Sequence, residues 1–165
     1  MKTNKELSHR KAQLGDLAQI LSLLKDDILG QTRESLDSST IPDHYIHAFN
    51  KISLDPNHYL MVIEVKGIIV ATCHLTLLPS LTFEGSTRLQ IEAVRVHSTY
   101  RNQKIGSWMM QEAMTFANKN GATIIQLTTN KLRPEAKRFY ERLGFVASHE
   151  GLKLVSCFTQ NNKPI

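Results

Sequence analysis

Apolar residues recur at helical spacing in four stretches of this 165-residue chain. The first follows a turn and N-cap at Gly15-Asp16, and its apolar positions fall on one helical face. The second opens at Pro42-Asp43 and runs to about Leu54, and the third ends at Asn120-Gly121. Pro134 opens the fourth and Gly144 ends it. The pattern therefore predicts about four helices.

Strand-like runs fill most of the remaining chain. Lys66-Gly67 separates two of them and predicts a tight hairpin. The near-continuous β-branched run at 122–129 is typical of a strand buried on both faces, which predicts a β-α-β unit over 88–129 with a parallel pair. The strands are predicted at 10–14, 59–65, 68–77, 88–97, 122–129, 145–147 and 152–158. Helices and strands together indicate an α/β (α+β) fold.

The alternation of apolar residues breaks inside the strand at 88–97. Apolar side chains stand at odd positions through Ala93 and then move to even positions with Val94 and Val96. A slip of one residue is what a β-bulge produces in a sequence. Glu92 lies beside the slip in an otherwise apolar segment, where a carboxylate is unfavourable unless it is hydrogen-bonded or functional.

A short polar, basic turn joins this strand to the third helix. The first N–H groups of a helix have no partner within the helix, and the helix dipole is positive at that end. A strand that leads into a helix through such a turn therefore predicts an anion site at the helix start.

Three segments resemble the GNAT superfamily of acetyl-CoA-dependent N-acetyltransferases. They are EAVRV at 92–96, YRNQKIG at 100–106 and RPEAKRFYERLGF at 133–145. The family turn has Gln or Arg, two residues, Gly, one residue, and Gly or Ala. Arg101 and Gly106 fit this pattern, whereas Lys104 stands where the first Gly is expected. The resemblance covers about 59–154 well and the first 55 or so residues loosely.

The resemblance implies a GNAT-like fold. It would be a mixed, mostly antiparallel sheet of six to seven strands with a central bulged strand, a parallel pair at the cofactor cleft, and about four helices on both faces. It further implies a single N-acetyltransferase domain over 1–165.

The resemblance also implies where acetyl-CoA binds as co-substrate, without a metal. Backbone amides after Arg101 would hold the pyrophosphate, with Arg101 and Lys104 adding charge, and the strand after Glu92 would pair with the pantetheine arm. The implied cofactor-binding residues are Val94, Arg95, Val96, Arg101, Asn102, Gln103, Lys104, Ile105, Gly106, Ser107 and Asn130.

Acetyl transfer to an amine calls for a base, because an alkyl amine titrates near about 10.4 and is mostly protonated at neutral pH. Glu92 is the candidate base, and burial among its apolar neighbours would suit it to proton transfer. The alternative is that Glu92 pairs with Arg88, Arg95 or another cation and only holds the strand. By resemblance, Tyr140 would be the general acid that protonates the leaving thiolate, and the alternative for Tyr140 is a core aromatic.

The sequence indicates the acceptor-binding residues less clearly than the cofactor-binding ones. Tyr45, His74 and Phe83 are substrate-side candidates, although His74 fits a structural or pocket-wall role better than a catalytic one. His44 and His47 are spaced like metal ligands, but no third ligand is evident near them. The identity of the amine and the length of the acyl chain stay open.

Charge and composition narrow the class of partner. The net charge of +5 and a pI near 9.3 suit an anionic partner, and a phosphorylated cofactor explains them as well as nucleic acid would. The basic residues form no single run and the sequence has no recognisable reading helix, so no nucleic-acid partner is expected. No apolar run approaches about 20 residues and the polar start lacks a secretory pattern, so we expect no membrane partner and a cytoplasmic location. A homodimer is possible, although no pattern specifies it.

These observations predict an acetyl-CoA-dependent N-acetyltransferase. It would act on a primary amine of a small molecule or peptide by direct attack in a ternary complex. The alternative is a non-catalytic acyl-CoA-binding sensor or interaction module of the same fold.

Overall fold

The computed structural model describes residues 7–26, 28–31 and 40–154. By its internal contacts the chain divides into two compact units, Met1–Leu127 and Thr128–Ile165. Each unit is described by itself below. The expectation of a single domain stays a prediction.

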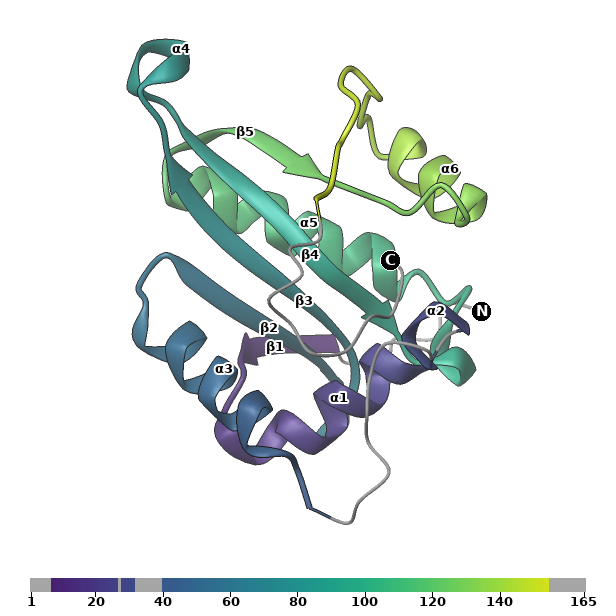
Figure 1. The fold of residues 1–165 in the computed structure, drawn as a ribbon. Helices are drawn as coiled ribbons and strands as arrows, with labels where there is room; N and C mark the ends of the chain where they lie inside the picture. The colour runs from purple at the N-terminus through teal and green to yellow at the C-terminus, as the bar shows by residue number, and fades with distance from the viewer. Residues whose placement is uncertain (1–6, 27, 32–39, 155–165) are drawn as a thin grey trace. The chain divides into compact units, whose positions relative to one another are not determined.

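The first unit is built on a five-stranded sheet with the strand order β1-β2-β3-β4-β5 (Figure 1). Its first three pairings are antiparallel, and β4 and β5 are parallel. The strands are β1 (Leu7–Lys11), β2 (His58–Val65), β3 (Ile68–Pro79), β4 (Thr87–Val96) and β5 (Ala122–Leu127). The predicted mostly antiparallel sheet with one parallel pair is confirmed.

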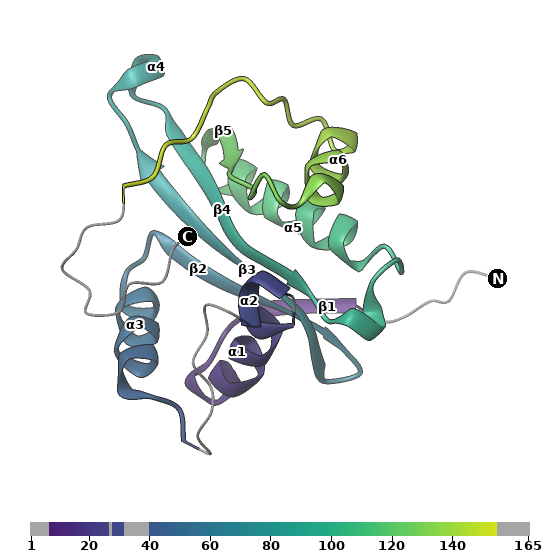
Figure 2. The ribbon, with the colours of Figure 1, turned by 45° about the vertical axis from the view of Figure 1, so that its right-hand side comes forward.

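Helices cover both faces of this sheet, as predicted. Figures 1 and 2 show α1 and α3 on one face and α5 on the other. The long helices of this unit are α1 (Leu17–Lys25), α3 (Asp43–Leu54) and α5 (Ile105–Lys119), and the short ones are α2 (Ile28–Gln31) and α4 (Thr82–Gly85). The second unit contains α6 (Pro134–Arg142).

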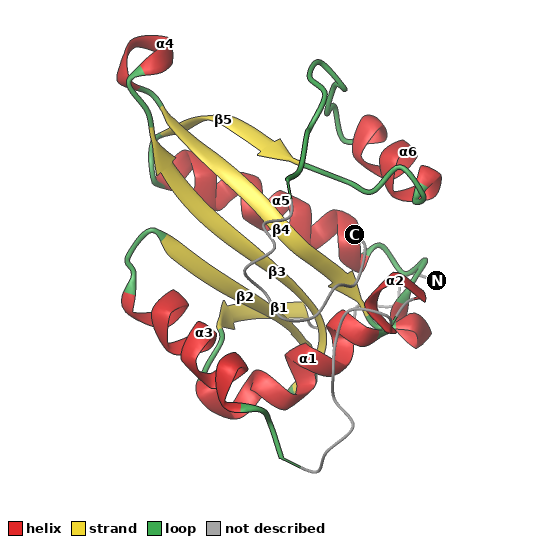
Figure 3. Ribbon diagram, viewed as in Figure 1, coloured by secondary structure: helices red, strands yellow, loops and turns green. Residues whose placement is uncertain are grey.

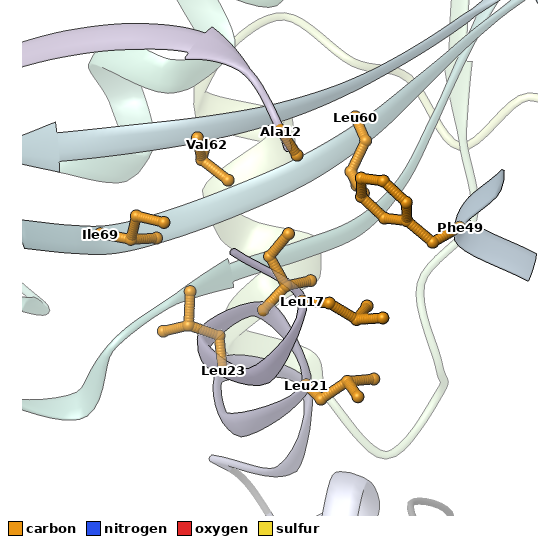
Figure 4. Packing of buried hydrophobic residues seen from close by; sticks show 9 residues of the cluster. Ala12, Leu17, Leu21, Leu23, Phe49, Leu60, Val62 and Ile69 are labelled. Carbon is orange, nitrogen blue, oxygen red and sulfur yellow. The ribbon is translucent and has the colours of Figure 1, made fainter. Parts of the chain in front are cut away.

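Two apolar layers hold the helices to the sheet. On one face, Leu17 and Leu21 of α1 and Phe49 of α3 pack in a cluster with Leu60 and Val62 of β2 (Figure 4). On α5, the buried positions recur at helical spacing, as expected of a helix with one apolar face. They are Ile105, Met109, Met110, Ala113 and Ala117.

The β2–β3 hairpin turns through Lys66 and Gly67, whose φ angles are 51° and 77°. Two positive φ angles define the primed turn that suits the twist of a two-residue hairpin. The register then shifts between Ile63 and Glu64, so Glu64 pairs with Ile69 while Ile63 pairs with Ala71. This irregularity sets which side chains of β2 and β3 share a face.

The strand predicted at 145–147 is wrong. The main-chain N–H of Ser148 donates to the carbonyl of Val146 at 2.9 Å, which closes a turn, and 81% of Val146 is exposed. Residues 152–154 are likewise exposed and not in a strand, and the rest of that predicted strand lies outside the described residues. The apolar residues in these two stretches do not pair with a neighbouring strand. The described residues therefore contain five strands rather than six to seven.

Candidate active site

β4 carries the predicted bulge. His74 of β3 pairs with Glu92 and Thr72 pairs with Arg95, so Ala93 and Val94 together face one residue, Cys73. The φ angle of Ala93 is 51°. A left-handed conformation is unfavourable for a residue with a Cβ by roughly 1–2 kcal/mol, so the bulge holds local strain. The phase slip in the sequence predicted this feature correctly.

β4 also separates from β5 directly before the bulge. The parallel pairing ends at Ile91 and Leu127, whereas β4 continues to Val96 (Figure 3). Two main-chain carbonyls in this segment accept side-chain bonds, Val94 from Arg95 Nη1 at 2.8 Å and Val96 from Arg101 Nε at 3.0 Å. A carbonyl oxygen has two lone pairs, so both can accept a further bond.

Glu92 is the last residue before the bulge, and its side chain is exposed. The burial that the sequence led us to expect is wrong. Arg88 donates instead to Thr82 at 2.6 Å, and Arg95 donates to Val94. Within 7–26, 28–31 and 40–154, the Glu92 carboxylate makes no ion pair, so pairing with these arginines does not explain its position.

His74 lies directly across the β3–β4 ladder from Glu92, and it is half-buried. Its Nε2 is 2.8 Å from Nδ1 of His58, and Nε2 of His58 is 3.7 Å from Oδ2 of Asp55. Burial, with a smaller effect of His58, lowers the pKa of His74 to about 4. The imidazole of His74 is therefore neutral near pH 7.

The turn after β4 has two residues with positive φ, Asn102 at 61° and Lys104 at 63°. Lys104 is the N-cap of α5, and its side chain does not cap the helix. The N–H of Trp108 makes the helix bond to the Lys104 carbonyl, so the N–H groups of 105–107 precede that bond. Ile105 contributes only main chain to the turn surface, because its side chain is buried. A glycine would adopt the Lys104 conformation without strain, which agrees with the glycine of the family pattern.

The Arg101 side chain makes its hydrogen bonds away from the start of α5. Its Nη2 donates to the carbonyl of Asp26 at 2.7 Å and lies 3.2 Å from the Asp26 carboxylate. The same carboxylate accepts the N–H of Ser98 at 2.6 Å. Arg101 and Asp26 thus join the turn to the end of α1, and a contact of Arg101 with a pyrophosphate stays a prediction.

A pocket beside this junction has no counterpart in the sequence-based expectations. It is lined by Ser22, Lys25 and Asp26 at the end of α1, by Gln31 of α2, and by His97 after β4. These residues come from three separate segments, so no local pattern could have brought them together.

The second unit carries Asn130 and Tyr140. Oδ1 of Asn130 accepts the N–H of Leu132 at 2.8 Å, which caps the turn that leads to α6. The ring of Tyr140 lies edge-on to Phe139 at 5.2 Å and to Phe145 at 5.9 Å. The roles of Asn130 and Tyr140 in binding and catalysis stay predictions.

Two substrate-side candidates have structural contacts of their own. Tyr45 packs against the cluster between α1, α3 and β2, and its ring lies 4.4 Å from that of His44. Phe83, at the tip of the β3–β4 hairpin, is 70% exposed, and the guanidinium of Arg88 lies 5.5 Å from its ring centre. Contact of either residue with an acceptor stays a prediction.

The part of the chain that the structure describes holds no group of three or more His, Cys, Asp or Glu side chains suited to a metal ion. None of its helices combines the length and apolar character that a membrane crossing needs.

The bulged strand, the separation of β4 from β5 and the turn into α5 are the features that the resemblance to the GNAT superfamily led us to expect. Residues 21–145 match the model of the acetyltransferase (GNAT) family, and the chain belongs to this family.

Two proteins similar to this chain carry different functional descriptions. A solved structure described as a transcriptional regulator from Bacillus halodurans C-125 is 45% identical, with a TM-score of 0.88, and the alignment covers 92% of this chain and 100% of that one. The aminoalkylphosphonate N-acetyltransferase of Salmonella typhimurium is 37% identical over 101 residues, or 58% of this chain, and the alignment spans only 62% of that relative.

A structure of a predicted acetyltransferase with acetyl-CoA from Clostridium acetobutylicum shares the fold. It is 20% identical, with a TM-score of 0.70 and coverage of 90% of this chain and 96% of that one.

Proposed function

We propose that this protein transfers an acetyl group from acetyl-CoA to a primary amine of a small molecule or peptide, by direct attack in a ternary complex. The observation that carries the proposal is the bulge in β4. It sets the carboxylate of Glu92, which makes no ion pair with another described residue, beside a strand segment that does not pair with β5.

Acetyl-CoA would bind along this segment and at the start of α5. The main chain of Val94 and Val96 would pair with the pantetheine arm as an added strand does. The N–H groups of 105–107 and the positive end of the helix dipole would hold the pyrophosphate, because they offer donors and charge at one point. The side chain of Lys104 would add to that charge.

Glu92 would act as general base and remove a proton from the amine. The nitrogen would then attack the thioester carbonyl, and a main-chain N–H near Val94, displaced from the regular ladder by the bulge, would stabilise the oxyanion. Tyr140 would protonate the departing thiolate, a role that rests on the resemblance of the segment 139–145 to the family's last motif.

Direct attack is favoured over an acyl-enzyme intermediate. Among the described residues, the thiol beside the bulge is that of Cys73, which faces Ala93 and Val94 across the β3–β4 ladder. Its side chain is fully buried, and burial raises the pKa of the Cys73 thiol to about 12. A thiol of that pKa supplies almost no thiolate at neutral pH, so it is a poor nucleophile.

The acceptor is expected to be a small amine. The relative from Salmonella typhimurium is named for an aminoalkylphosphonate, a small amine with an anionic group. A basic chain with a net charge of +5 would attract such a molecule. A second candidate, a non-catalytic acyl-CoA-binding module, would bind the same co-substrate without turnover.

Calorimetric titration of the purified protein with acetyl-CoA, coenzyme A and a DNA duplex tests the proposal. We expect micromolar binding of acetyl-CoA and no duplex binding at either of two salt concentrations. An amine panel assayed for thiol release then separates the enzyme from the non-catalytic module. Absence of acetyl-CoA binding would reduce the proposal to a shared fold, and duplex binding that weakens steeply with salt would support a nucleic-acid partner.

The substitution Lys104→Gly is expected to raise the free energy of unfolding by about 1 kcal/mol, because glycine adopts a φ of 63° without strain. The same substitution is expected to weaken acetyl-CoA binding about two- to fivefold and to reduce its salt dependence, since one positive charge is lost at the helix start. Thermal unfolding and calorimetry measure the two effects.

Lys66→Gly is the matched control for this substitution. Lys66 has a φ of 51° in the β2–β3 hairpin, so its replacement should stabilise the fold similarly and leave acetyl-CoA binding unchanged. Equal affinity and salt dependence in the Lys104→Gly and Lys66→Gly variants would mean that the Lys104 side chain is only solvent-facing.

A further inference from the structure

A row of polar side chains crosses three strands on the face that α1 and α3 cover in part. His74 pairs with Leu60 of β2 on one side and with Glu92 of β4 on the other. Residues directly opposite in an antiparallel ladder point to the same face, with Cβ atoms about 5 Å apart. His58 pairs with Thr76, two residues from His74 on β3, so His58 and His74 also share this face.

The two imidazoles are joined by a short hydrogen bond. Nδ1 of His58 and Nε2 of His74 are 2.8 Å apart, and Thr76 Oγ1 is 3.3 Å from the same Nδ1. A neutral imidazole has one donor and one acceptor nitrogen, so one ring donates to the other. Because the pKa of His74 is lowered to about 4, this ring is neutral at working pH and can accept a proton at one nitrogen while it releases one at the other.

The far end of the row opens to solvent at Asp55. Its Oδ1 accepts the N–H of Asn57 at 2.8 Å, which holds the carboxylate beside His58 in the turn before β2. The Asp55 side chain is 44% exposed, compared with 27% for His58. Among the described residues, Glu92 of β4 lies opposite His74 in the ladder without a hydrogen bond to it, and Asp55 lies beside His58 in this turn.

We propose that His74 and His58 conduct to solvent, at Asp55, the proton that Glu92 removes from the amine. This inference rests on the proposed function. Acetyl-CoA and an amine that lie over the bulge would cover the exposed side of Glu92, so without another exit the proton would stay on Glu92 until the products leave.

The steps balance without a further reactant. The C–N bond forms and the C–S bond breaks. The protonated amine loses two protons: the first passes to Glu92, and the second would replace the proton that Tyr140 gives to the departing thiolate. Glu92 then protonates Nδ1 of His74, the Nε2 proton of His74 moves to Nδ1 of His58, and the Nε2 proton of His58 leaves to water beside Asp55. Exchange with water afterwards restores the first tautomer of each ring. His74 and His58 act through Glu92, so they are positioning residues rather than catalytic ones.

The substitution His58→Gln tests the relay, because an amide can keep a hydrogen bond to His74 but cannot pass a proton on. We expect kcat at pH 7 to fall about tenfold while KM for acetyl-CoA stays unchanged. In His58→Ala, added imidazole is expected to restore most of the lost kcat, and a merely structural role would not produce this rescue.

His9→Gln is the matched control. His9 is also a half-buried strand histidine, 33% exposed, and its Nε2 lies 3.3 Å from Glu112 of α5. The kcat of His9→Gln should equal that of the unchanged protein. If the unchanged protein is active, equal kcat values for His58→Gln and His9→Gln would overturn the relay but not the proposed function. The same conclusion would follow if imidazole restores no activity to His58→Ala.

A second readout does not depend on turnover. Nitrogen NMR of histidine-labelled protein is expected to show His74 neutral, with its proton on Nε2, between about pH 6 and 8. A charged His74, or a proton fixed on Nδ1, would overturn the relay whether or not the protein is active. Absence of acetyl transfer to every amine by the unchanged protein would overturn the proposed function, and the relay with it.

Discussion

Replacing Glu92 with glutamine is expected to lower kcat at pH 7 by about 10²–10³-fold, within the roughly 10²–10⁴-fold that general acid–base catalysis contributes. Glutamine has nearly the same shape but accepts no proton, and the Glu92 carboxylate has no ion pair within the described residues that the change would break. The fold should therefore be unaffected. As pH rises toward the amine value of about 10.4, the free amine fraction grows about tenfold per unit, so the deficit should shrink.

A pH profile of kcat for both proteins, with circular dichroism to check the fold, measures this effect. Glu84→Gln is a suitable control, since Glu84 is an exposed carboxylate at the tip of the hairpin that leads into β4. A profile for Glu92→Gln that parallels that of the unchanged protein at every pH would remove Glu92 as the base.

Changing Tyr140 to phenylalanine is expected to lower kcat by about 10–10²-fold and to leave the Kd for acetyl-CoA nearly unchanged. A thiol titrates near about 8.5 and a phenol near about 10, so the hydroxyl is a reasonable proton donor to the departing thiolate. The ring contacts with Phe139 and Phe145 would persist in the variant.

Single-turnover kinetics and calorimetry separate the rate effect from the affinity effect. Tyr59→Phe is the matched control, because the Tyr59 ring packs 5.0 Å from Phe116 of α5, on the opposite side of the sheet from His74. If acetyl-CoA affinity or thermal stability collapses in Tyr140→Phe, the hydroxyl serves packing and not acid catalysis.

Local patterns were sufficient to predict the four longer helices α1, α3, α5 and α6, the parallel pair and the bulge, but not the short helices α2 and α4. The slip between Ala93 and Val94 is a one-residue event that alternation records directly, because side chains in a strand alternate with a period of two. The same alternation explains why the expected burial of Glu92 was wrong. Its apolar sequence neighbours Ile91 and Ala93 do not share its face, so they could not bury it.

The partnership of His58 and His74 could not be predicted in the same way. A regular hairpin through Lys66-Gly67 would place His58 opposite Leu75, with its side chain on the wrong face. The register shift at Ile63 places it opposite Thr76 instead. No residue in that stretch indicates this irregularity, since the segment is apolar on both sides of Glu64 and contains no glycine or proline at the shift.

A long-range contact explains why the sequence did not predict the partner of Arg101. Arg101 matches the family turn, but its guanidinium contacts Asp26, which lies 75 residues away in sequence. Nothing near either residue records that contact. A charged side chain in a binding motif can also serve the scaffold, and only the tertiary structure distinguishes the two uses.

The backbone around the site also limits how the protein can be engineered. Ala93 and Lys104 hold left-handed conformations without being glycine, and each is unfavourable by roughly 1–2 kcal/mol against a typical total stability of about 5–15 kcal/mol. Selection for heat resistance alone would therefore favour glycine at both positions. At Ala93 that gain would come with a looser bulge and a less fixed Glu92, so thermostability and catalytic precision compete at this residue.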